Sequence, residues 1–222
     1  MKTAEEIKHA VLRELAWDTR VEVAEVGVEV TEGVVTLSGT VSSYGEKMAA
    51  QEAAHRVACV HDVVNAIEVK ALGAHARSDV ELAQMARHVL AWDVLVPDDS
   101  ITLTVDHGWI TLEGTVKVWA QRDEAERAIQ HLAGVQGITN LITVEAPPLK
   151  SQDIRLAIQE ALWRRATREA NHIEVSVDGG HVTLSGQVQS PQEKRAILGT
   201  ISHAPGVSAI HDQLRVSPST QR

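Results

Sequence analysis

The chain of 222 residues is 44% hydrophobic and carries a formal net charge of −9 at pH 7, which is typical of a globular protein whose acidic surface repels nucleic acids. No run of residues approaches the ~18 apolar positions of a membrane-spanning helix, and the residues after Met1 lack the apolar segment of a secretory signal. The single cysteine, Cys59, excludes an intramolecular disulfide. We therefore expect a cytoplasmic protein, with peripheral attachment to a membrane left open.

One motif occurs three times and divides the chain into three modules. Its copies are residues 34–41, 109–116 and 181–188, and each follows a turn glycine. These turn glycines are Gly33, Gly108 and Gly180, spaced 75 and 72 residues apart. Such a repeat predicts tandem structural units. We place the modules at residues 1–72, 73–146 and 149–217, with a frayed tail at 218–222.

The first module is predicted to contain two helices and three strands. Residues 4–16 show helical periodicity, and Thr3 with Glu6 forms a capping box before them. Alternating valines predict a strand at 26–30, a turn at 31–33 closed by Gly33, and a second strand at 34–41. Ser43 begins a helix that runs to about Ala58. A third strand follows at 63–69.

The second and third modules repeat this order of elements. In the second, Ser78 caps the first helix, the turn lies at 106–108 and the last strand at 138–144. In the third, Ser151 caps the first helix, the turn lies at 178–180 and the last strand at 210–216. Residues 146–148 read as a stiff linker because two prolines adjoin.

The order of elements predicts the fold class. It is α+β, with three tandem αββαβ modules. Strands one and two of a module form an antiparallel hairpin, and the helical crossover makes strand three parallel to strand two. Each module should therefore be a small mixed three-stranded sheet with two helices on one face. The other face carries Thr and Ser, and is exposed or packed on a neighbouring module.

Each module has a valine-rich strand followed by a turn glycine, Val-Thr-Leu-Ser-Gly-Thr-Val or a close variant, a helix, and Pro-Gly-Val or a variant of it before an alternating strand. This pattern resembles the BON domain. The glycines of the family pattern fall on Gly33, Gly39, Gly108, Gly114, Gly134, Gly180, Gly186 and Gly206. The first module has Cys59 where the others have Gly134 and Gly206. The resemblance implies modules without catalytic residues, often proposed to bind phospholipid surfaces and linked to osmotic or envelope stress.

We interpret these glycines as structural. The turn glycines supply a positive φ. Gly39, Gly114 and Gly186 lie in the middle of a strand, where a missing Cβ usually marks a bulge or a close backbone approach. We expect that approach to come from the second helix of each module.

The sequence contains no catalytic motif and predicts neither an enzyme nor a cofactor site. A nucleophile elbow, phosphate loop, His-Glu-x-x-His and Cys-x-x-Cys are all missing. His55 and His61 bracket Cys59 and could suggest a metal site. The other modules have no equivalent ligands, so the favoured interpretation is a loop thiol beside surface histidines, with no metal.

The aromatic residues suggest a contact surface in the second module. Trp17 and Trp92 end the first helices and are expected to cover the core. Trp109 and Trp119 stand at positions that do not face the core, and Trp119 aligns with Tyr44 of the first module. These side chains either pack between modules or form an apolar surface for a partner.

A basic cluster lies in the third module. Arg164, Arg165 and Arg168 follow Trp163, near the predicted end of the module's first helix. They either complement the helix dipole or bind anionic lipid headgroups. The three parts of the chain, 1–72, 73–147 and 148–222, carry charges of −5, −6 and +2, so contact with an anionic surface is expected through the third module.

Two functions are therefore open. The first is a non-enzymatic adaptor that binds anionic phospholipid through the third module under osmotic or envelope stress. The alternative is a cytoplasmic scaffold that binds protein through the Trp109 and Trp119 surface and does not bind lipid.

Overall fold

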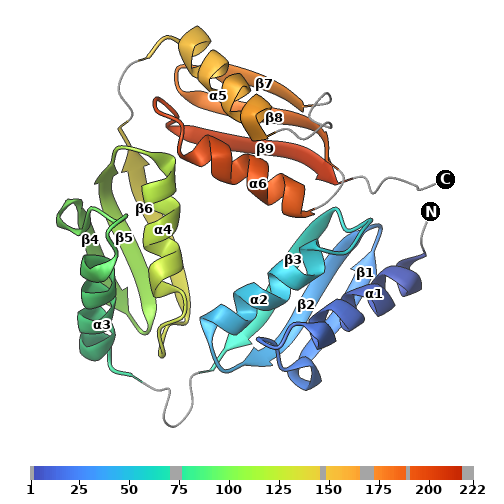
Figure 1. Ribbon diagram of the computed structural model, residues 1–222. Coiled ribbons are helices and arrows are strands. Elements are labelled where there is room, and N and C mark those ends of the chain that lie inside the picture. Colours follow the sequence, from blue (N-terminus) through green and yellow to red (C-terminus); the bar gives the residue numbers. More distant parts are fainter. Residues whose placement is uncertain (1–2, 71–76, 146–148, 166–172, 189–190, 217–222) are drawn as a thin grey trace. The chain divides into compact units, whose positions relative to one another are not determined.

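The computed structural model describes residues 3–70, 77–145, 149–165, 173–188 and 191–216. Each of the three modules runs helix, strand, strand, helix, strand (Figure 1). The predicted fold class, α+β with three repeated modules, is confirmed. The modules are described below one at a time.

The helices and strands have similar lengths in all three modules. The first module has α1 (Ala4–Trp17), β1 (Val26–Thr31), β2 (Val34–Val41), α2 (Tyr44–His55) and β3 (Asp62–Val69). The second has α3 (Asp79–Trp92), β4 (Ile101–Asp106), β5 (Trp109–Val116), α4 (Trp119–Ile129) and β6 (Gly137–Val144). The third has α5 (Ser151–Arg165), β7 (Ile173–Asp178), β8 (His181–Val188), α6 (Pro191–Ser202) and β9 (Ala209–Val216).

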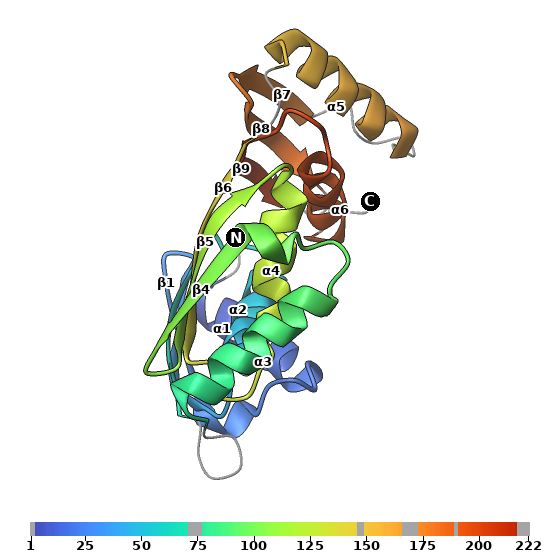
Figure 2. The same ribbon diagram turned by 90° about the vertical axis from the view of Figure 1, so that its left-hand side faces the viewer.

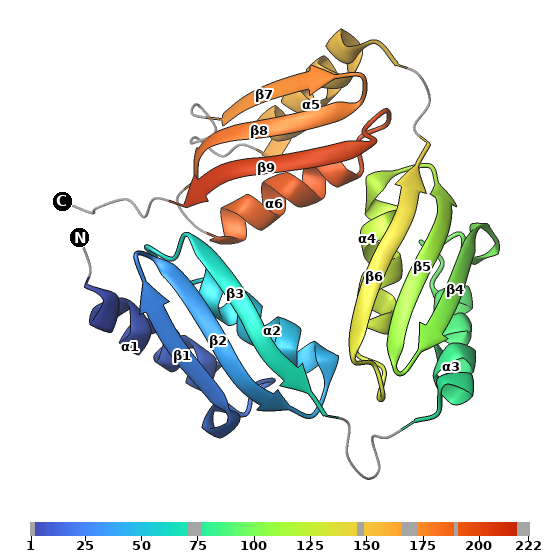
Figure 3. The ribbon, with the colours of Figure 1, turned by 180° about the vertical axis from the view of Figure 1, so that it is seen from behind.

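Each sheet has the motif strand at its centre. The strand orders are β1-β2-β3, β4-β5-β6 and β7-β8-β9. In the first module β1 pairs antiparallel with β2, and β3 pairs parallel with β2. The third module has the same pairing. Both helices of a module lie on one face of its sheet, as Figure 2 shows for α3 and α4, and Figure 3 shows the strands of each module in front of its helices.

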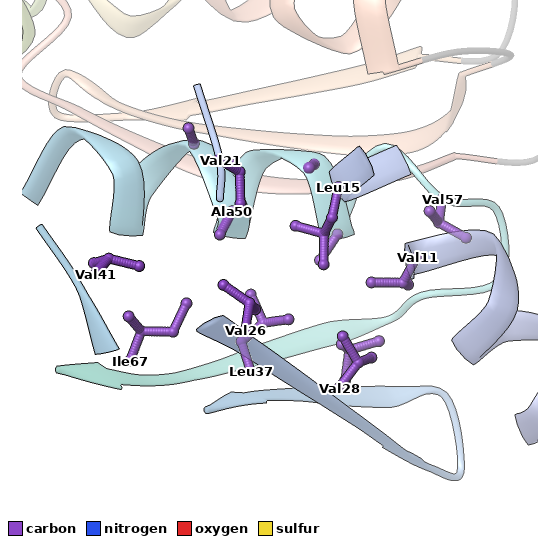
Figure 4. Close-up of a cluster of buried hydrophobic side chains, with 14 of the residues drawn as sticks. Val11, Leu15, Val21, Val26, Val28, Leu37, Val41, Ala50, Val57 and Ile67 are labelled. Carbon is purple, nitrogen blue, oxygen red and sulfur yellow. The ribbon is translucent and has the colours of Figure 1, made fainter. Parts of the chain in front are cut away.

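The core of each module lies between this sheet face and the two helices. In the first module, Leu15 of α1, Leu37 of β2 and Ile67 of β3 belong to one buried cluster, and all three are at most 1% exposed (Figure 4). The alanines on the inner face of α2 are also buried, with Ala50 at 0%. Small side chains there let the helix lie close to the sheet. In the third module Ile158 takes part in the same kind of core.

Two details of the predicted helices are wrong. The second helix ends at His55 rather than Ala58, because the chain tightens into a turn in which Val57 N–H donates to the carbonyl of Ala54 at 3.1 Å. Ser151 is the first residue of α5 rather than its cap. Its hydroxyl accepts a hydrogen bond from the Gly179 N–H at 3.2 Å instead. The predicted linker at 146–148 and the tail at 218–222 lie outside the described residues.

The hairpin turns are two residues long. In the first module Glu32 has φ +51° and Gly33 has φ +82°. Positive φ at both central residues defines the type I′ turn, which matches the twist of the flanking strands. The carbonyl of the turn glycine then accepts a hydrogen bond at 2.9 Å from the residue that precedes the third strand. The donors are His61, Gln136 and Ser208 in the three modules, and the acceptors are Gly33, Gly108 and Gly180.

The glycine in the middle of the motif strand faces the backbone of the preceding strand. Gly39 has φ +123°, and a Cβ there would collide with the carbonyl oxygen of Glu25, just before β1. A Cβ on Gly114 would collide in the same way with the carbonyl oxygen of Ser100, before β4. The expected approach of the second helix is therefore wrong. The close neighbour is the chain that enters the first strand.

Candidate functional site

A charged network at the end of α1 links the two helices of the first module. The Asp18 carboxylate accepts hydrogen bonds from Arg20 and Arg56, each at 2.9 Å. Arg56 also donates to Glu14 at 2.8 Å, and Arg20 to Glu52 at 3.1 Å. The hydrogen bonds from Arg20, assisted by Arg56 and opposed by burial, hold the pKa of Asp18 well below its ordinary value. Every charge named here is paired with an opposite one, so the network stabilises the fold.

A second polar contact joins the second helix to the third strand. In the second module, the Asn140 side chain donates to the Arg122 carbonyl at 2.9 Å and accepts from the Ile142 N–H at 3.2 Å. The Arg122 guanidinium in turn donates to the carbonyls of Asn140 and Ile142 at 2.9 and 3.2 Å. We call this pair of residues the helix–strand clamp.

The helix–strand clamp has equivalents in the other modules. In the first, Asn65 donates to the Lys47 carbonyl at 3.0 Å. In the third, Lys194 pairs with Asp212 at 2.7 Å. Our sequence reasoning missed these residues. The spacing of 75 and then 72 residues, which relates the turn glycines, also relates Lys47, Arg122 and Lys194 and would have found them.

Trp119 packs on the helix–strand clamp. The guanidinium carbon of Arg122 lies 4.8 Å from the centre of the Trp119 ring. Such a contact is a cation–π interaction. Trp119 is half-buried, as is Tyr44, the first residue of α2. Trp119 therefore has a structural partner within its own module.

Trp109 also has partners within its module. Its indole N–H donates to the Thr139 hydroxyl at 2.8 Å. Its ring lies where a Cβ on Gly137 would be, so only a glycine fits beneath it. The side chain is 50% exposed, which leaves part of it open to solvent. Trp109 begins β5 and Trp119 follows the end of that eight-residue strand, so the two lie at opposite ends of it.

The tryptophans at the ends of the first helices do not cover the core. Trp17 is 86% exposed and Trp92 is 77% exposed. The expectation is wrong because Leu15 and Leu90, two residues earlier in each case, close the core instead and are fully buried. On a helix, positions two residues apart point to different sides.

Three exposed apolar residues stand close together in the sequence at the end of α3. Val94 is 98% exposed and Leu95 is 61% exposed, beside Trp92. We call residues 92–95 the apolar loop. Periodicity alone did not single it out, because a short apolar run after a helix resembles the start of a buried strand.

A comparison of the sequence with known protein families explains the repeat. A family model described as the BON domain matches residues 3–71, 78–146 and 150–218. The chain belongs to the BON domain family. The BON family is one of non-catalytic binding domains, which indicates a binding or adaptor role for this chain.

Comparisons by sequence and by structure find further proteins that this BON protein is similar to. It is 27% identical over 129 residues to a protein of Anaplasma centrale described as "Uncharacterized protein in gshII 5'region", which covers 55% of this chain and 85% of that protein. CdsD, a structural protein of the type III secretion system of Chlamydia trachomatis, aligns at 14% identity over 96% of this chain and 92% of its own, with a TM-score of 0.28. The PrgH periplasmic domain aligns at 8% identity over 86% of this chain and 95% of its own, with a TM-score of 0.23. Scores this low support no functional argument.

The basic cluster lies at the edge of the described part of the third BON module. Trp163, Arg164 and Arg165 belong to the last turn of α5, and only their backbone is described. Arg168 lies outside the described residues. The predicted headgroup site therefore stays a prediction.

The described residues around Cys59 do not form a recognisable metal site. Cys59 is exposed and has φ +76°. The His61 ring lies against Gly33 of the hairpin turn. In the described ranges no three His, Cys, Asp or Glu side chains group closely enough to hold a metal. In the same ranges no helix is long and apolar enough to cross a membrane.

Proposed function

We propose that this chain is a non-enzymatic adaptor whose third BON module binds an anionic phospholipid surface, in a response to osmotic or envelope stress. The observation that carries the proposal is the charge distribution. The part of the chain from residue 148 onward carries +2, whereas the two parts before it carry −5 and −6. Trp163, Arg164 and Arg165 close α5, and Arg168 follows them in the sequence. A tryptophan beside arginines is typical of a contact with lipid headgroups.

The expected attraction is weak. Each arginine near an anionic surface contributes about 1 kcal/mol, so the cluster supplies about 3 kcal/mol. The acidic first and second modules oppose it. Binding should therefore be visible at low ionic strength and weaken as added salt shortens the screening length, which is about 8 Å at physiological ionic strength.

Co-sedimentation with liposomes tests this function. The protein should pellet with vesicles that contain an anionic lipid at low salt, and should not pellet with purely zwitterionic vesicles. The double substitution Arg164→Glu with Arg165→Glu should abolish pelleting. No pelleting of the unaltered protein at low salt would overturn the proposal.

A matched control separates a local site from a general charge effect. Lys150→Glu with Arg155→Glu changes the net charge by the same amount at the other end of α5, where both residues are exposed. This control variant should keep most of its vesicle binding. An equal loss in both double variants would show that total charge matters and that the arginine cluster is not a site.

The second candidate function is a protein scaffold that binds through Trp109 and Trp119 of the second module, with Tyr44 as the aligned aromatic position of the first. It is supported by the half-exposed ring of Trp109 on an acidic module. In this case Trp109→Ala should weaken binding of a protein partner, and vesicles should not bind at all. Trp119→Ala should mainly lower stability, since Trp119 packs on Arg122.

We also propose that each repeat is a separate domain, with boundaries at 1–72, 73–146 and 149–217. The proposal is supported by the first and third cores, whose buried residues all come from one repeat each.

A further inference from the structure

Hydrogen bonds hold the backbone of the apolar loop of the second module in place. The Asp93 carboxylate accepts a hydrogen bond from the Leu95 N–H at 2.9 Å, and the Val96 N–H donates to the Asp93 carbonyl at 3.1 Å. Val96 itself is 5% exposed and anchors the loop in the core. Val94 and Leu95 therefore face solvent in a loop that does not collapse onto the module.

The equivalent loop of the first module contains residues that stabilise the fold. At the equivalent spacing of 75 residues, Asp93 corresponds to Asp18, and Leu95 corresponds to Arg20. Arg20 is part of the charged network of the first module. The second module thus keeps the loop aspartate and carries exposed apolar groups where the first has a paired arginine and Thr19. Val94 and Leu95 are 98% and 61% exposed, so neither is buried in the core of the module, which points to a contact with another molecule.

The surroundings of the apolar loop are acidic along the chain. Residues 88–116 include five carboxylates and no Lys or Arg. Three of these carboxylates, Asp93, Asp98 and Asp99, lie within or just after the loop. An anionic membrane would be repelled by such a segment, and a cationic partner attracted.

We propose that the apolar loop binds a cationic amphipathic segment of a partner protein. Apolar side chains of the partner would cover Trp92, Val94 and Leu95, and its lysines or arginines would face the flanking aspartates. Trp92 is 77% exposed, and tryptophan is one of the residue types found most often at binding hot spots. The inference rests on the adaptor role proposed above, and adds a protein-binding surface separate from the arginine cluster.

A model peptide tests the inference with the full chain. The probe is a fluorescently labelled helical peptide of Leu and Lys, with the leucines on one face, and its anisotropy reports binding. We expect a Kd in the micromolar range at low salt. Val94→Ser with Leu95→Ser should weaken binding by about 10-fold or more, since it removes two anchors. Asp99→Lys should also weaken it and reduce its dependence on salt.

Two substitutions serve as matched controls. Trp17→Ala removes the equivalent tryptophan of the first module, whose exposure of 86% is similar, and should leave peptide binding unchanged. Val80→Ser removes an exposed valine at the other end of α3 and should also have no effect. Thermal unfolding checks that every variant is folded.

Several results would overturn the inference. These are equal binding of a peptide with Glu in place of Lys, unchanged binding by the Val94→Ser and Leu95→Ser variant, or no binding near millimolar peptide. Vesicle pelleting that depends on Val94 and Leu95 would assign the loop to a membrane instead. Self-association lost in the same variant would assign it to a second copy. Vesicle binding through Arg164 and Arg165 should not change in this variant, so failure of the loop proposal and of the lipid proposal are distinguishable.

Discussion

The charged carboxylate of Asp18 stabilises the fold, and the size of this stabilisation should depend on pH. Its side chain is 9% exposed and is held by Arg20 and Arg56. The lowered pKa means that this contribution is complete above the unfolded pKa near 4 and is lost as pH falls toward the folded pKa. Asp18→Asn should cost about 2 kcal/mol at pH 7, because charged hydrogen bonds are lost.

Urea unfolding at pH 7 and pH 3 measures this effect. The gap between Asp18→Asn and the unaltered chain should narrow at pH 3. Glu52→Gln is the control, since Glu52 is 44% exposed and meets only the outer arginine, Arg20, among the described ion pairs of the network; it should cost less than about 0.5 kcal/mol. A gap that is equally wide at both pH values would contradict the role assigned to the carboxylate.

Cys59 is strained where the other modules have glycine. It has φ +76°, and Gly134 and Gly206 have φ +96° and +85° at the equivalent turns. A left-handed conformation costs a residue with a side chain about 1–2 kcal/mol, partly offset by the greater freedom of glycine in the unfolded chain. Cys59→Gly should therefore stabilise the chain by about 0.5–1 kcal/mol in thermal unfolding. Cys59→Ala, which keeps the Cβ, should bring no such gain.

Among the elements, the strands were the most predictable from the sequence. Alternating valines and the turn glycines place all three hairpins, because period-two burial leaves one register for each strand. The helix–strand clamp was not predicted, since Asn140 within a strand reads as a solvent-facing residue. Only the folded chain shows that its side chain reaches the backbone of α4. A glycine pattern likewise cannot reveal which backbone approaches Gly39.

The helix–strand clamp should contribute measurably to the stability of the second module. Asn140→Ala removes hydrogen bonds to the Arg122 carbonyl and the Ile142 N–H and leaves half-buried backbone groups without them. The expected cost is about 1–3 kcal/mol in chemical unfolding. Leu141→Ala is the matched control, because Leu141 is the next residue of the same strand and its side chain is 54% exposed. A cost for Leu141→Ala as large as for Asn140→Ala would contradict this assignment.

At the scale of the whole molecule, the repeat predicts three modules but says little about where they bind. The repeated motif describes what the modules share, which is their core and their turns. A binding surface is where one module differs from the others, as the apolar loop differs from the charged network around Asp18. Such a difference matters for binding only where the side chains are exposed. Trp17 and Trp92 show that exposure at the end of a helix cannot be predicted from the helical pattern. The fold was therefore predictable in detail, and the candidate surfaces mostly were not.

The proposed domain boundaries imply that single modules fold without the others. The buried residues of the first core run from Ile7 to Ile67, and those of the third from Ile154 to Leu214. Fragments 1–72 and 149–217 should each unfold cooperatively, with a modest free energy of about 3–5 kcal/mol because a core of this size is near the lower limit for independent folding. Circular dichroism during urea unfolding measures both.

A shorter fragment supplies the control for this prediction. Residues 1–58 lack β3, which pairs with β2 along its whole length and contributes the buried side chain of Ile67. Without that strand the sheet is a two-stranded hairpin, which is at best marginally stable in water. This fragment should be unfolded while 1–72 is folded. If 1–72 were also unfolded and the full chain were not, contacts beyond the repeat would be needed, and the three-domain description would have to be replaced.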